Sequence, residues 1–253
     1  MTSLSVGRTF RTLFVTARQP KAAPKHRPGE LFQISDSEVP LADICFSCIV
    51  SFKRSDQTKD DSQEQPPQAR FASILDGRPP MSWPPTPAVD IDAIVATFPG
   101  LHSESFPIVQ IRKVDMKEFN AGKPVDQHRE LLFYRLLAPL SREAPNSHVL
   151  VHAFESDRNG LLMAGNHNGI GFTLGKAVTM SCSFFVHVNA DQAVMEFCHE
   201  SGDGWWVQEV SFPRMAAGRT TITSKIWSPQ GTHVATAHQD GICRPAAASK
   251  VRL

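Results

Sequence analysis

The sequence predicts an α+β protein in which an antiparallel sheet wraps around one central helix. The first observation is the order of patterns in the second half of the 253-residue chain: strand, strand, helix, and then a run of strands. A doubly wound parallel fold needs a helix between most strands, and this order lacks them. The second observation is that the first half carries two strand patterns, which look like the tail of a similar unit.

Charge and hydropathy exclude two classes of partner. Lys and Arg number 26 and Asp and Glu number 25, so no global field attracts nucleic acid or an anionic membrane. No apolar run approaches the roughly 18–20 residues that span a bilayer. The N-terminus also lacks the sustained apolar stretch of a secretory signal. We therefore expect no nucleic-acid partner, no membrane span and no secretory signal.

The cysteines predict neither a disulfide framework nor a metal site. Five cysteines, an odd number, lie among apolar residues, which is typical of reduced thiols in an intracellular protein. Cys45 and Cys48 form a C-x-x-C motif inside a strand pattern, where residues three apart face opposite sides. No second C-x-x-C or paired histidine motif completes a zinc site. We expect no metal and no cofactor.

The first half of the chain predicts two strands and two irregular stretches. Residues 6–19 and the segment ICFSCIVSF at 44–52 are rich in β-branched and aromatic residues, which favours strands. Residues 20–43 show little periodicity and predict a long loop. Residues 55–105 are polar and then proline-dense, which predicts an irregular linker with one short helix at 90–96.

The second half predicts one apolar helix among many strands. The helix begins near Ser147 and carries Asp157, and a glycine-rich turn follows it. In the segment RELLFYRLLAPL, alternation places Leu132, Tyr134 and Leu136 on one face and Phe133 and Arg135 on the other. The predicted strands of this half lie at 107–115, 129–140, 178–188, 193–201, 205–215, 219–229 and 232–244.

Several motifs, in order, resemble those of the type II acyl-CoA thioesterases. The first half contributes GRTFRTLFVTARQ and ICFSCIVSF. The second half contributes HRELLFYRL, SDRNGL, HNGIGF, AVTMSCSFFVH and HVATAHQDGICR. Each motif alone is modest, but seven in the order of the family are specific. The family has a double hotdog fold, in which antiparallel sheets wrap on central helices.

The resemblance implies a division of the chain. Residues 1–54 correspond to a partial N-terminal hotdog with strands but no helix, because the opening strands and first helix of the family are missing. Residues 55–105 are the linker, 106–245 the C-terminal hotdog and 246–253 a tail. The expected fold is therefore a double hotdog whose first hotdog is incomplete.

The resemblance also assigns three site residues. The catalytic Asp of the family falls on Asp157, its Ser or Thr on Thr179, and its Gln on Gln239. These side chains suit thioester hydrolysis: a carboxylate accepts the proton of a water molecule, and a hydroxyl and an amide hold the water or the oxyanion. Each also has an ordinary structural interpretation, as a capping carboxylate, a strand-forming Thr, or a Gln that satisfies backbone groups.

The chain departs from the family pattern beside this site. Ser181 and Cys182 stand where the family has Asp and His, which removes a charge and a polar ring next to Thr179. Residues 20–42 also lengthen a connection that is usually a short hairpin.

The expected function is hydrolysis of acyl-CoA to a free acid and coenzyme A by a water that Asp157, Thr179 and Gln239 position. The alternative is a catalytically weak or inactive hotdog protein that binds acyl-CoA or a partner subunit. A hotdog dehydratase or hydratase is a third possibility, but such enzymes use a His with Asp or Glu, and His152 and His187 lack a recognisable partner motif.

Two further expectations concern assembly and location. Double hotdogs commonly associate, and an uncovered first sheet would expose apolar surface, so we expect a homo-oligomer. The terminal Val251-Arg252-Leu253 resembles the end of a peroxisomal address, except that Val replaces the expected small residue. The alternative location is the cytoplasm.

Overall fold

The computed structural model describes residues 1–21, 40–55, 61–98, 108–197 and 204–246. The chain divides into two compact units, Met1–Thr58 and Lys59–Leu253. Most of the predicted loop at 20–43 and the C-terminal Val251-Arg252-Leu253 lie outside the described residues. No helix among the described residues is long and apolar enough to cross a membrane.

The first unit contains a three-stranded antiparallel sheet in the order β1-β2-β3. Its strands are β1 Thr2–Val6, β2 Phe10–Pro20 and β3 Leu41–Lys53. The strand predicted over residues 6–19 is present from Phe10 onward as β2, whereas the separate strand β1 was not predicted. The Gly7 amide donates to the Phe10 carbonyl at 2.8 Å, which closes a tight turn and allows β1 to pair back on β2.

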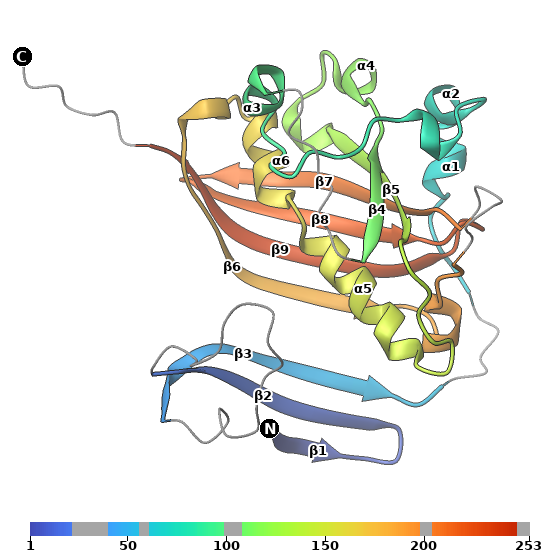
Figure 1. The fold of residues 1–253 in the computed structure, drawn as a ribbon, viewed down its shortest axis with the longest axis vertical. Helices are drawn as coiled ribbons and strands as arrows, with labels where there is room; N and C mark the ends of the chain where they lie inside the picture. Colours follow the sequence, from blue (N-terminus) through green and yellow to red (C-terminus); the bar gives the residue numbers. More distant parts are fainter. Residues whose placement is uncertain (22–39, 56–60, 99–107, 198–203, 247–253) are drawn as a thin grey trace, which may run out of the picture. The chain divides into compact units, whose positions relative to one another are not determined.

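The second unit contains a six-stranded antiparallel sheet and a helix that is broken once (Figure 1). The strand order is β4-β5-β7-β8-β9-β6. The strands are β4 Val109–Lys113, β5 Arg129–Leu136, β6 Leu174–Val186, β7 Trp206–Ala216, β8 Arg219–Trp227 and β9 His233–Pro245. Helices α5 Pro145–Asp157 and α6 Gly160–His167 cross one face of this sheet. This arrangement confirms the predicted α+β class.

Short helices make up the remaining elements of the second unit. The α-helices are α1 Pro67–Arg70, α2 Ala72–Leu75, α3 Asp92–Thr97 and α4 Lys117–Asn120. The 3-10 helices are η2 Pro80–Ser82, η3 Val125–Gln127, η4 Gly171–Thr173 and η5 Ala190–Ala193. The short helix predicted near residues 90–96 is therefore present as α3.

Side chains are buried on both faces of the six-stranded sheet. Leu132, Tyr134 and Leu136 pack in the core that contains residues of α5 and α6, and Phe133 packs in a second core, as the alternation predicted. The second core receives Phe71 and Trp83, which are 4% and 1% exposed. The segment predicted as an irregular linker therefore supplies a covering layer to the sheet, because its short helices carry large apolar residues inward.

The strand predicted at 193–201 is absent from its described part, residues 193–197. Helix α5 supplies the reason, because its histidines bond to the backbone here. His152 donates from Nε2 to the Ala193 carbonyl at 2.8 Å, and the Met195 amide donates to His148 Nδ1 at 3.2 Å. These backbone groups are satisfied by side chains and need no neighbouring strand. The apolar Ala193 and Met195 are still buried, which explains why the pattern resembled a strand.

His152 lies at the centre of the helix–sheet core with both ring nitrogens bonded. The Tyr134 hydroxyl donates to His152 Nδ1 at 2.7 Å, and His152 Nε2 donates to the Ala193 carbonyl. This pattern fixes the neutral ring, because both a donor and an acceptor are needed. Burial lowers the pKa of His152 from 6.5 to about 4, with a smaller contribution from His148.

We predict that His152 makes the second unit sensitive to acid. A ring whose folded pKa is depressed contributes stability that is present above pH 6.5 and lost as the pH falls toward 4. The loss amounts to about 3 kcal/mol, from 1.36 kcal/mol per pKa unit. Urea unfolding followed by tryptophan fluorescence measures this, because all four tryptophans lie in the second unit. His152→Gln should have a flatter pH profile than the wild type, whereas the exposed control His238→Gln should not. Parallel profiles for all three proteins would contradict the assignment.

Candidate active site

Three elements bring Asp157, Thr179 and Gln239 together. Gln239 on β9 donates from Nε2 to Asp157 Oδ1 at 2.5 Å and to Thr179 Oγ1 at 2.7 Å. Gln239 is 5% exposed, whereas Asp157 and Thr179 reach solvent. The buried amide therefore holds a carboxylate from the end of α5 and a hydroxyl from β6 at the surface of the sheet. The sequence predicted these three residues, and they share one hydrogen-bonded cluster.

A two-residue break between α5 and α6 sets the place of Asp157. Asp157 is the last residue of α5, and Arg158 leaves the helix with ψ 130°. Asn159 then adopts the left-handed conformation with φ 55°. Asn tolerates this region better than most residues because its short polar side chain bonds locally. The segment SDRNGL thus encodes the break locally, although the sequence predicted one continuous helix.

Two glycines allow α6 to lie close to the sheet. A Cβ at Gly160 would lie 2.8 Å from Oε1 of Gln239. A Cβ at Gly241 on β9 would lie 2.6 Å from Cδ2 of Leu161 and 2.9 Å from the Val178 carbonyl. A side chain at Gly241 would push α6 away from β9, whereas one at Gly160 would displace the amide of Gln239. The amide of Gln239 is therefore enclosed by the first turn of α6.

A bulge in β6 brings a fourth residue to the site. Thr179 pairs with Gly241 and Cys182 pairs with Gln239, with a shift in register between Thr179 and Ser181. Residues three apart on a regular strand face opposite sides, but one extra residue restores the same face. Cys182 therefore faces the same side as Thr179, as its strand partner Gln239 does. Sequence alternation missed this, because a bulge leaves no signal in the residue pattern here.

Electrostatics within the site favour a weakly acidic Asp157. Burial on the sheet side raises the pKa of Asp157 above its usual value, although the carboxylate also reaches solvent. Burial and then the charge of Asp157 raise the pKa of the Cys182 thiol. Oε1 of Gln239 is buried and has no hydrogen-bond partner among the described residues. Because Nε2 of Gln239 bonds to Asp157, the carbonyl end of the amide points away from the carboxylate, as charge repulsion requires.

A pair of charged residues is buried at the helix break. Glu155 and Arg158 have side chains that are 0% and 8% exposed, and Nε of Arg158 lies 3.6 Å from Oε2 of Glu155. Burial raises the pKa of Glu155 to about 7, and the Arg158 charge opposes this shift. Nε2 of Gln208 on β7 donates to the Glu155 carbonyl at 3.1 Å and to Ser224 Oγ at 2.9 Å. The pair was not predicted from the sequence, because charged residues beside an Asp are usually solvated.

The other candidate residues lie elsewhere. Among the described residues, no group of three or more His, Cys, Asp or Glu is arranged to hold a metal ion. Both nitrogens of His152 are bonded within the core, and Nε2 of His187 lies 2.8 Å from the Thr236 hydroxyl. Neither arrangement offers the His–carboxylate pair that a dehydratase or hydratase requires.

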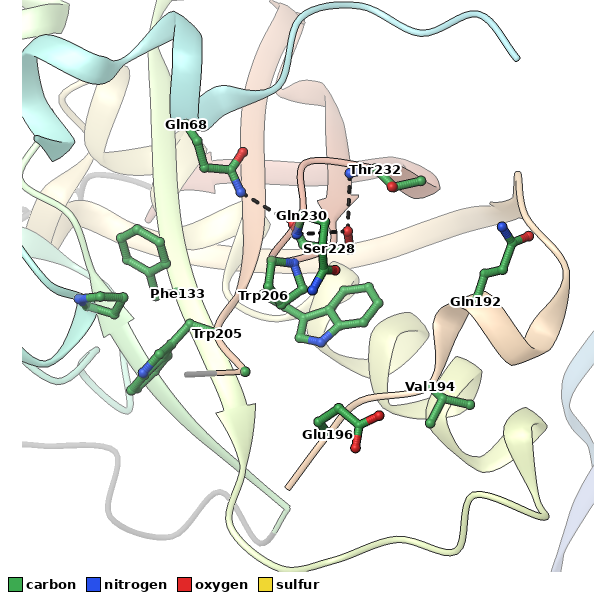
Figure 2. Close-up of a pocket in the computed structure, with 13 residues that line it drawn as sticks. Gln68, Phe133, Gln192, Val194, Glu196, Trp205, Trp206, Ser228, Gln230 and Thr232 are labelled. Carbon is green, nitrogen blue, oxygen red and sulfur yellow. Dashed lines mark hydrogen bonds between the residues drawn. The ribbon is translucent and has the colours of Figure 1, made fainter. Parts of the chain in front are cut away.

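An open cleft of about 760 Å³ lies away from this cluster (Figure 2). Its walls include the aromatic residues Phe133, Trp205 and Trp206, with Glu196 on another side. Gln68 closes one edge, where its amide donates to the Ser228 carbonyl. None of the three clustered residues Asp157, Thr179 and Gln239 lines this cleft. The cleft and the hydrogen-bonded cluster are therefore separate features.

Solved structures share the fold of the whole chain. The acyl-CoA thioesterase II TesB2 from Mycobacterium marinum is 19% identical with a TM-score of 0.59, and the match covers 97% of this chain and 72% of that one. The TesB protein of Mycobacterium avium subsp. paratuberculosis is 17% identical with a TM-score of 0.54, and the match covers 96% and 70%.

A third similar structure is a conserved protein of unknown function with a hot dog fold from Alicyclobacillus acidocaldarius. It is 11% identical with a TM-score of 0.52, and the match covers 96% of this chain and 71% of that one. These similarities confirm the predicted hotdog fold. A search of curated proteins found no match. The family model of the acyl-CoA thioesterase C-terminal domain matches residues 51–243. Because this match spans most of the chain, the protein belongs to the acyl-CoA thioesterase family.

Proposed function

We propose that this protein hydrolyses acyl-CoA thioesters to a free acid and coenzyme A, with Asp157 as the general base. The observation that carries the proposal is the pair of hydrogen bonds from one buried amide, that of Gln239, to Asp157 and Thr179. This arrangement presents a carboxylate and a hydroxyl side by side toward solvent, where a water molecule and a thioester can enter.

Hydrogen-bond counting gives each residue a distinct role. Both N–H groups of the Gln239 amide are engaged, one by Asp157 and one by Thr179. Gln239 is therefore a positioning residue that orients the other two. The Thr179 oxygen accepts from Gln239, so its own hydrogen is available to donate. The second oxygen of Asp157 is available to accept a proton from water.

The reaction then proceeds in two steps. Asp157 takes a proton from water as the water oxygen bonds to the thioester carbon, and the carbonyl electron pair moves onto oxygen. The Thr179 hydroxyl donates to this oxyanion. The intermediate collapses with cleavage of the C–S bond, and the proton on Asp157 passes to the departing thiolate. The raised pKa of Asp157 makes it a stronger base than an exposed carboxylate.

We predict that Asp157→Asn and Gln239→Ala each lower acyl-CoA hydrolysis on the order of 10²-fold or more, because each disturbs water activation. A thiol-release assay across acyl chain lengths measures this and shows the preferred substrate. The exposed Asp191→Asn is the matched control and should retain full activity. The wild-type rate should also fall as the pH decreases through the pKa of Asp157, because protonation removes the base. Wild-type rates in both site variants would refute the assignment.

Gly160→Ala tests the close approach of α6 to Gln239. The added Cβ meets Oε1 of Gln239, the free end of a flexible side chain, so the amide moves while the fold persists. We expect a loss of turnover on the order of 10- to 100-fold, because a small misplacement disrupts catalytic geometry. The melting temperature should change little. Gly165→Ala in the same helix, where a Cβ meets Cys243 Sγ at an ordinary 3.4 Å, should keep its activity. Equal activity in both variants would contradict this role for Gly160.

The alternative function is binding of acyl-CoA without hydrolysis. The observation that favours it is Cys182, which faces Asp157 where the resembling family has a His. A thiol supplies a weaker hydrogen bond than an imidazole. Purified protein that binds acyl-CoA but releases no free thiol would select this alternative over hydrolysis.

We also propose that the chain associates with itself. The three-stranded sheet of the first unit exposes large apolar side chains on both faces, including Phe46 at 56% on one face and Ile49 at 66% on the other. Soluble monomers rarely leave large apolar patches uncovered. We expect sedimentation velocity to show a dimer or larger species, and Ile49→Lys to shift the distribution toward monomer. A well-behaved wild-type monomer would contradict this proposal.

A further inference from the structure

Glu155 and Arg158 form a charged pair that flanks Asp157 inside the protein. Glu155 is in the last turn of α5, and Arg158 is the first residue beyond it. Both side chains are almost fully buried. Burying a carboxylate and a guanidinium costs desolvation energy that their attraction often fails to recover. The pair is therefore a poor source of stability, and another role has to explain its position.

The surrounding contacts converge on the point where α5 ends. The Arg158 amide donates to the Glu155 carbonyl at 3.2 Å, and Gln208 Nε2 donates to the same carbonyl at 3.1 Å. The side chains also meet, with Nε of Arg158 3.6 Å from Oε2 of Glu155. This distance is a charge contact and is longer than a good hydrogen bond. The two residues thus tie the end of α5 to the segment that leads into α6.

We propose that the Glu155–Arg158 pair is a positioning device that fixes the helix break and so aims Asp157 at Gln239. Asp157 lies between the two residues in the chain, and its carboxylate bonds to Gln239 at 2.5 Å. A change of the angle between α5 and α6 would move Asp157 relative to β9. The expected effect on kcat rests on the proposed hydrolytic function. The claim that the pair fixes the helix break rests on the contacts alone.

The central experiment replaces both charges with apolar side chains of similar volume. In Glu155→Leu/Arg158→Met, the desolvation cost disappears, so the protein should unfold at or above the wild-type temperature. The tie across the break is also lost, so we expect kcat to fall at least ten-fold with KM within about two-fold. The single variant Glu155→Leu removes the carboxylate that contacts the buried Arg158 guanidinium and should melt at a lower temperature than the double variant.

A matched control removes another partly buried ion pair from the opposite face of the same sheet. Arg70 makes two bonds to Glu209, which is on β7 beside Gln208 and faces the second core. Arg70→Met/Glu209→Leu should retain the wild-type kcat, because this pair does not touch the helix break. Glu155→Gln serves as a gentler variant that keeps the shape of the side chain and removes its charge, and it is compared with the wild type above pH 8, where the Glu155 carboxyl group with its pKa of about 7 is ionised. We expect it to fold as the wild type and to lose about five-fold in kcat.

Alkylation of Cys182 supplies a readout that does not depend on hydrolysis. Cys182 is exposed and senses the charge of Asp157, so its reaction with iodoacetamide reports where that carboxylate lies. Peptide mass spectrometry across a pH series separates Cys182 from the other thiols. Asp157→Asn should shift the Cys182 profile toward lower pH, because the thiolate no longer faces a negative charge. Both Glu155 variants should shift it in the same direction.

The outcomes separate the two proposals. If the wild type releases no thiol from acyl-CoA, the hydrolytic function fails, and the Cys182 profile alone decides whether the pair positions Asp157. If Glu155→Leu/Arg158→Met keeps the wild-type kcat, the positioning role is overturned. It is equally overturned if kcat falls while the Cys182 profile stays that of the wild type, because Asp157 has then not moved.

Discussion

The contact between the Gln239 amide and the end of α5 is the constraint on which the site depends. This amide joins the C-terminal strand of the sheet to a helix that lies about eighty positions earlier in the chain. It can do so only because α6 approaches β9 closely, and Gly160 and Gly241 permit that approach. The three groups of the candidate site are therefore held by packing between helix and sheet, together with the two-residue break that ends α5 at Asp157.

Motif order and alternation predicted more of this structure than did local propensity. The clustering of Asp157, Thr179 and Gln239 and the two faces of β5 followed from the sequence, because an ordered set of motifs and a period of two are direct signals. The helix break, the bulge after Thr179 and the irregular path at 194–197 did not follow. The helix break is set locally by Asn159 and the bulge lies in the pairing of β6 with β9, and neither changes the apolar periodicity. The irregular path depends on tertiary contacts, because His152 donates to the Ala193 carbonyl and His148 accepts from the Met195 amide. Such contacts have no signature in a single strand or helix pattern.

Charge is distributed unevenly around the site. The solvent side holds one carboxylate, Asp157, beside a thiol, whereas the buried side holds the Glu155 carboxyl group in contact with the Arg158 guanidinium at 3.6 Å. Burying an acid and a guanidinium costs desolvation energy, so this part of the fold keeps a defined backbone geometry at the expense of stability. The substitution of Cys182 for the His of the resembling family changes the solvent side alone. Specificity is therefore expected to respond to the surface residues, whereas the rate responds to both sets, because the buried residues set the alignment.

The layer formed by residues 61–98 limits how short a fragment of the chain can be and still fold by itself. Phe71 and Trp83 cover the face of the sheet that carries Leu131 and Phe133. A fragment beginning at residue 106, where the motifs alone would place the start of the catalytic hotdog, would present that face to water and invite aggregation. A fragment meant to carry the site should therefore begin near residue 61, so that an autonomous folding unit includes nearly forty residues that bear no catalytic group.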